Sequence, residues 1–160
     1  MPWFASLVAG RPRIVSALAF GGSTAALTHI AWHADARWSG AIPLITLGAG
    51  LAHCVAGAIT GPRLLDTSRT RTSARAAVVG AQTSLLALVF FAPGMAIYVS
   101  SSNASSTGAL AFVGLTLLTG LFAFLAAGWG LLLLSAGVGV GLNWLAIGGP
   151  PTAGEPLSPP

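Results

Sequence analysis

The chain has 160 residues, of which 54% are hydrophobic and only 6% are charged. Soluble globular domains carry about 25% charged residues, so this composition excludes a soluble enzyme, a disordered chain and a fibrous repeat. The mean hydropathy of +0.83 instead predicts an all-α, polytopic membrane protein, built as a bundle of four or five transmembrane helices.

The charged residues are few, and the basic ones are all of one type. All seven basic residues are arginines, and none lies on a basic helix face that could follow a phosphate backbone, so we expect no nucleic acid as a partner. Arginine without lysine, together with many Ala, Gly and Pro, is typical of a GC-rich genome. On that codon argument we expect a bacterial protein of the cytoplasmic (inner) membrane.

Residues 1–13 form an apolar lead that suits the membrane interface. The bundle is expected over residues 14–149. Its first span, about 14–33, follows two arginines and is longer than the apolar core of a signal peptide, so we interpret it as a retained helix. The second span covers about 42–60 and is expected to stop at Gly61-Pro62.

A third span is predicted over about 74–100, with Thr72 or Ser73 as its N-cap and a kink or early end at Pro93-Gly94. Polar loops precede and follow this span. The Pro-rich tail, residues 150–160, cannot form a helix.

Residues 108–149 contain no charge. One helix of that length would be about 60 Å long, twice the thickness of the hydrocarbon core, so we expect a break. In one alternative a fourth span over about 108–134 is followed by an interfacial stretch, residues 135–149. In the other, two spans turn at Ala127-Gly128-Trp129-Gly130, which makes residues 135–149 part of a fifth span.

Six of the seven arginines precede the first span or lie between the second and third spans. These segments face the same side of the bundle, which the positive-inside rule makes cytoplasmic. The N-terminus is therefore predicted to be cytoplasmic. The arginines between spans two and three either fix the topology or bind anionic lipid head groups: Arg63, Arg69, Arg71 and Arg75.

Three histidines in or near the spans are candidate cofactor-binding residues: His29, His33 and His53. The cofactor itself is not identified by the sequence; a neutral imidazole could ligate a haem or a chlorophyll-type pigment. A pair of His29 and His53 is disfavoured by an expected depth difference of about 10 Å. The alternative is a neutral histidine that hydrogen-bonds a carbonyl or hydroxyl group on a neighbouring helix. No other metal site is assigned.

Small residues share helix faces with these histidines. Gly22 and Ala26 lie on the face of His29, while Gly50, Gly57 and Gly61 lie on the face of His53. Small residues let helices approach closely, so both faces are predicted to pack against another helix, of this chain or of a partner.

The spans contain no carboxylate that could orient a histidine, and the loops are too short to build a site outside the membrane. We therefore expect no enzyme. The sequence predicts a non-catalytic accessory or structural subunit of a larger membrane complex, with larger membrane subunits and lipid as its partners. The alternative is a tetrapyrrole-binding redox or light-harvesting subunit. A small channel or transporter is a weaker alternative, because ion coupling usually needs an acid within the membrane.

Overall fold

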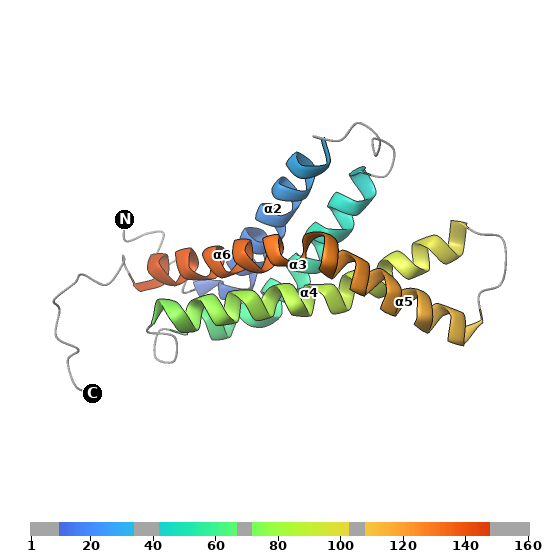
Figure 1. Ribbon diagram of the computed structural model, residues 1–160. Coiled ribbons are helices and arrows are strands. Elements are labelled where there is room, and N and C mark those ends of the chain that lie inside the picture. The colour runs from blue at the N-terminus through green and yellow to red at the C-terminus, as the bar shows by residue number, and fades with distance from the viewer. Residues whose placement is uncertain (1–9, 34–41, 67–71, 103–107, 148–160) are drawn as a thin grey trace.

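A computed structural model describes residues 10–33, 42–66, 72–102 and 108–147. Within these ranges the chain is helical and contains no strand, which confirms the predicted all-α class (Figure 1). The elements are α2 (Pro12–His33), α3 (Ile42–Leu64), α4 (Ser73–Ser102), α5 (Ala109–Ala123), the π-helical segment η2 (Phe124–Gly128) and α6 (Trp129–Ile147).

Three helices of the described part are long and apolar enough to cross a membrane. They are Leu44–Leu64, Ser73–Ser101 and the continuous helix Ala109–Ile147. Helix α2 is not among them, so a first crossing over residues 14–33 stays a prediction. The lead up to residue 9 and the tail from residue 148 lie outside the described residues.

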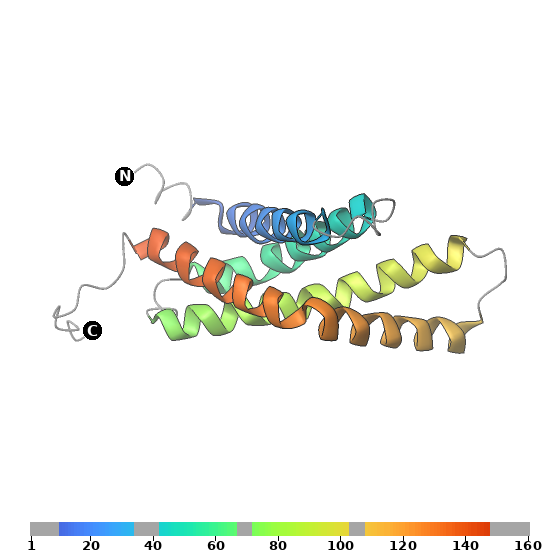
Figure 2. The same cartoon turned by 45° about the horizontal axis from the view of Figure 1, so that its top comes forward.

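The helices form two antiparallel pairs, α2 with α3, and α4 with the continuous helix α5–η2–α6 (Figure 1). The four helical segments α2, α3, α4 and α5–η2–α6 meet at the end of the bundle where α2 and α4 begin and where α3 and α6 end. We call this end of the bundle the converging end. Toward the opposite, splayed end the two pairs diverge, as both views show (Figure 2).

The main core lies at the converging end, where each helix contributes one residue. Phe20 of α2, Leu64 of α3, Ala76 of α4 and Leu142 of α6 form one buried cluster. A smaller cluster of alanines joins α3 to α4 further along. Helix α5 has no buried residue, although its sequence is strongly apolar.

Glycines bring the helices of each pair into close contact. On α3, a Cβ atom at Gly57 would lie 2.7 Å from the Ser16 carbonyl oxygen of α2, and one at Gly61 would lie 2.8 Å from the Pro12 carbonyl oxygen. Between α4 and α6, a Cβ atom at Gly139 would lie 2.6 Å from the Ala76 carbonyl oxygen. Only glycine permits backbones at these separations without displacement.

Two helix boundaries can be compared with the sequence analysis. The backbone N–H of Arg75 donates to Thr72 Oγ1 at 3.3 Å, so Thr72 is the N-cap of α4. Helix α3 does not stop at Gly61 but continues through Pro62 to Leu64. The missing N–H of Pro62 falls in the last turn, where one lost bond is tolerated, and Leu65 N still bonds the Gly61 carbonyl oxygen at 2.9 Å.

Residues 109–147 form one continuous helix, and how much of that helix crosses a membrane stays a prediction. The chain neither turns back at 127–130 nor leaves the helical conformation before Ile147. It inserts the π turn η2 and changes direction there (Figures 1 and 2). The segment has no polar turn residue, so local widening of the helix keeps the backbone groups bonded, whereas a reversal would expose them.

Candidate functional site

His53 lies in the middle of α3 and is 4% exposed. Its Nδ1 atom is 3.0 Å from the Ala49 carbonyl oxygen one turn earlier. A carbonyl oxygen can only accept, so Nδ1 carries the proton and donates it to Ala49. In the neutral ring Nε2 is then the acceptor, and Ser84 Oγ of α4 lies 3.1 Å from it.

Ser84 connects three helices. Its hydroxyl oxygen lies 3.1 Å from His53 Nε2, 2.6 Å from Ser135 Oγ and 3.0 Å from the Leu131 carbonyl oxygen of α6. A hydroxyl has one proton and two lone pairs. When Ser84 donates to the neutral His53 ring, it accepts from Ser135, and the Leu131 carbonyl keeps its donor from the helix ladder of α6.

A second hydroxyl pair also joins α3 to α4: Thr60 lies about two turns after His53 on α3, whereas Thr83 directly precedes Ser84 on α4. Thr60 Oγ1 and Thr83 Oγ1 are 2.8 Å apart, and both are buried. Each also lies within 3.0 Å of a carbonyl oxygen in its own helix. We call the five buried side chains the polar seam: His53, Thr60, Thr83, Ser84 and Ser135.

The chemistry open to the polar seam is limited by its burial. A serine hydroxyl next to an imidazole is the pairing of a nucleophile with its base. Here Ser84 is 2% exposed and His53 is 4% exposed, so a substrate could reach them only if α3, α4 and α6 separated. Within the described ranges no three His, Cys, Asp or Glu residues gather to hold a metal. The geometry of the polar seam suits a structural role, in which its hydrogen bonds hold α3, α4 and α6 together.

The structure does not bring the predicted cofactor ligands together. Ala25 of α2 lies beside Gly50 of α3, which places His29 about two turns, or 10 Å, from the level of His53. The His53 ring turns toward α4, while His29 is exposed on α2. His33 is the last residue of α2, and its side chain lies outside the described part. Axial ligation by His53 would require its Nε2 atom to leave Ser84.

The predicted packing residues fall into two groups. Gly50, Gly57 and Gly61 are buried against α2. Gly22 and Ala26 are exposed on the other side of α2, and nothing outside the local helix backbone lies within 4 Å of a Cβ position at Gly22. The same residue type therefore serves an internal contact on α3 and lies uncovered on α2.

The described arginines gather at the converging end. They lie at the start of α2, at the end of α3 and at the start of α4, and all four are exposed: Arg11, Arg13, Arg63 and Arg75. Asp66 lies at the same end. Arg69 and Arg71 fall outside the described residues, so their predicted role in lipid binding or topology stays a prediction.

The sequence predicted, as one alternative, a hydroxyl partner for a histidine, but it did not identify Ser84 or Ser135, and it missed the burial of one amide. Ser135 is the only hydroxyl residue of α6, which was the available signal for a role inside the bundle. Asn143 is fully buried, and neither atom of its amide has a hydrogen-bond partner in the described structure. Its position inside a helix without charge was visible, but its burial was not.

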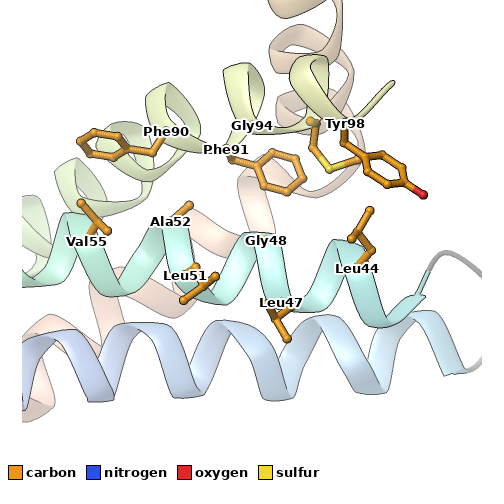
Figure 3. A pocket seen from close by; sticks show the side chains of 11 residues that line it. Leu44, Leu47, Gly48, Leu51, Ala52, Val55, Phe90, Phe91, Gly94 and Tyr98 are labelled. Atoms are coloured by element: carbon orange, nitrogen blue, oxygen red, sulfur yellow. The ribbon is translucent and has the colours of Figure 1, made fainter. Parts of the chain in front are cut away.

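An apolar groove of about 360 Å³ opens between α3 and α4 where the two pairs begin to diverge (Figure 3). Tyr98 of α4 and Leu44 of α3 face each other across the part nearer the splayed end. The lining is otherwise aliphatic and aromatic: Leu47, Gly48, Leu51, Ala52 and Val55 on α3, and Phe90, Phe91, Gly94 and Met95 on α4.

These features define an all-helical protein with a polar seam inside, an apolar exterior and three helices suited to crossing a membrane. Comparison with protein-family models, with curated proteins and with solved structures gave no match.

Proposed function

We propose that the protein is a non-catalytic accessory subunit of a larger integral membrane complex, and that it packs against larger subunits through small-residue helix faces. One observation carries this proposal. Glycines form the close contacts that hold α2 to α3 and α4 to α6, and further glycines lie on the outside of the bundle, where no helix of the described part of the chain covers them.

The uncovered faces lie on α2 and α6. On α6, Gly139 packs against α4, whereas Gly137 and Gly141 lie on the same helix with no neighbouring atom within 4 Å of their Cβ positions. On α2, Gly22 is equally open. Lipid chains gain little from a glycine surface, while a neighbouring helix gains close van der Waals contact, which is why small residues concentrate at helix interfaces in membranes.

Exposed apolar side chains support placement in a membrane. Leu110 is 90% exposed, Leu133 is 75% exposed and Phe122 is 73% exposed, all on the continuous helix of α5 and α6. Such a surface in water would be an aggregation site. With the arginine-bearing converging end on the cytoplasmic side, next to anionic lipid head groups, the bundle fits a bacterial inner membrane with a cytoplasmic N-terminus.

The proposal is tested by gentle solubilisation of native membranes, followed by sizing and mass spectrometry. We expect the wild-type chain to migrate with larger subunits. Gly137→Leu and Gly141→Leu should release it from them, because a leucine keeps the partner backbone away. Gly114→Leu is the matched control, since Gly114 is also open but lies among exposed leucines of α5.

Two results would contradict this function. One is migration of the wild-type chain as a lone 16.0 kDa bundle in its detergent micelle. The other is a Soret or chlorophyll-type absorption band in the purified protein, which would favour the tetrapyrrole alternative. His53 offers that alternative no support, because both of its ring nitrogens already lie within hydrogen-bond distance of other groups.

A further inference from the structure

The splayed end of the second pair is an arm with little support from the rest of the molecule. It consists of residues 94–102 of α4 and of α5, which pack on each other and extend past α2 and α3 (Figure 1). No residue of α5 is buried. Few interactions therefore oppose a movement of the arm as a unit.

The α4 side of the arm begins at a break in the helix ladder. Pro93 lies inside α4 and has no N–H to donate to the Val89 carbonyl oxygen four residues earlier. Nothing outside the local helix backbone lies within 4 Å of a Cβ position at the following residue, Gly94. Helix α4 can therefore bend between Val89 and Gly94 without a clash at Gly94.

The α5 side of the arm begins at a second irregularity, the π turn η2. Ser84 Oγ of α4 lies 3.0 Å from the Leu131 carbonyl oxygen on one side of η2. On the other side, a Cβ atom at Gly120 would lie 3.3 Å from Ala92. Since α4 and α5–η2–α6 run antiparallel, η2 lies level with the stretch of α4 around Val89. The break in α4 at Pro93 and the π turn η2 therefore lie side by side.

The level of Pro93 and η2 along the second helix pair also divides the groove between α3 and α4 into two parts. Ala52 lies on the fixed part of the groove and belongs to the alanine cluster of α3 and α4. Met95 and Tyr98 line the groove beyond the break, on the arm, and Tyr98 lies opposite Leu44 (Figure 3). A movement of the arm would change the width of the groove near Tyr98 and leave the width near Ala52 unchanged.

We propose that Pro93 and η2 form a paired hinge, about which the arm swings toward and away from α3, closing and opening the groove between Leu44 and Tyr98. The helices on the other side of the hinge are held by the polar seam and by glycine contacts, so the movement is confined to the arm. This inference does not depend on the proposed subunit role.

The test is a distance measurement between spin labels in lipid vesicles of phosphatidylcholine and phosphatidylglycerol. Labels replace Leu44 and Tyr98 in a Cys54→Ala background and are read by double electron–electron resonance. We expect two populations, or a distribution about twofold wider than that of a control pair at Ile59 and Val78, which lie on α3 and α4 on the fixed side of the hinge.

Pro93→Ala restores an N–H for the Val89 carbonyl oxygen, and we expect it to reduce the Leu44–Tyr98 distribution to the width of the control pair. Hydrogen exchange gives an independent reading: amides of residues 90–97 should exchange faster than those of residues 80–87, and Pro93→Ala should slow them about tenfold. A wild-type distribution as narrow as the control overturns the hinge. So does a wide distribution that Pro93→Ala leaves unchanged.

Discussion

The converging end and the splayed end of this bundle differ in how tightly their helices pack. At the converging end four helices each contribute to one core, and at Gly57 and Gly139 the backbones come into close contact. At the splayed end α5 is as apolar as any helix and buries nothing. In lipid, apolar surface by itself does not drive helices together. Side-chain size and polar partners therefore decide which ends pack.

Gly57→Leu at the converging end is one of the two substitutions for which we expect the largest effect. The side chain would meet the Ser16 carbonyl oxygen, 2.7 Å from the Cβ position, and α2 would have to move. We expect a loss of about 3 kcal/mol in the free energy of unfolding. The half-buried Cys54 lies against Gly21 at the same contact, so its labelling by a thiol-reactive dye during heating reports the unfolding.

The matched control is Gly114→Leu on α5, where nothing outside the local helix backbone lies within 4 Å of the Cβ position. It should leave the unfolding temperature unchanged. Equal unfolding temperatures for Gly57→Leu and wild type would show that the α2–α3 contact does not hold the bundle together.

Asn143→Leu is expected to stabilise the converging end by about 2 kcal/mol. The amide is fully buried without a partner, and burial of an unpaired amide costs about 1–3 kcal/mol. Leucine has the same branch point and removes that cost. Asn143→Ala removes the same amide but leaves a cavity, so it should gain less. A lower unfolding temperature for Asn143→Leu would mean that the amide has a partner in the membrane.

Ser84→Ala should cost about 1 kcal/mol, since polar contacts between membrane helices average about 0.6 kcal/mol and this one serves both His53 and Ser135. The measurement is the same dye assay, with Thr116→Ala as control because the hydroxyl of Thr116 bonds only its own helix. In a double-mutant cycle Ser84 and Ser135 should be coupled, and strict additivity would argue against the polar seam.

The smallest effect is expected on the arm. Phe122→Ala removes a side chain that is 73% exposed and should change the free energy of unfolding by less than about 0.5 kcal/mol. Phe20→Ala at the converging end removes a fully buried ring and should cost about 3 kcal/mol. Similar losses for the two phenylalanines would remove the contrast between the two ends.

Composition and local sequence patterns predicted the helical class, the apolar surface and several helix ends. Charge, hydropathy and capping act locally, which is why Thr72 could be named as a cap of α4. The sequence did not determine the path of residues 108–149, because a π turn is a choice of backbone bonding that hydropathy does not record.

The tertiary structure alone decided which neighbour each face meets. Helical periodicity places Gly57 and Gly22 on small-residue faces, yet only the packing of α2 on α3 buries the first and leaves the second uncovered. The sequence likewise placed His53 within a predicted span. It did not show that Ser84, 31 residues later, would lie 3.1 Å from the His53 ring. Contacts between distant segments depend on how helices are rotated and paired, and no local pattern in the chain fixes that geometry.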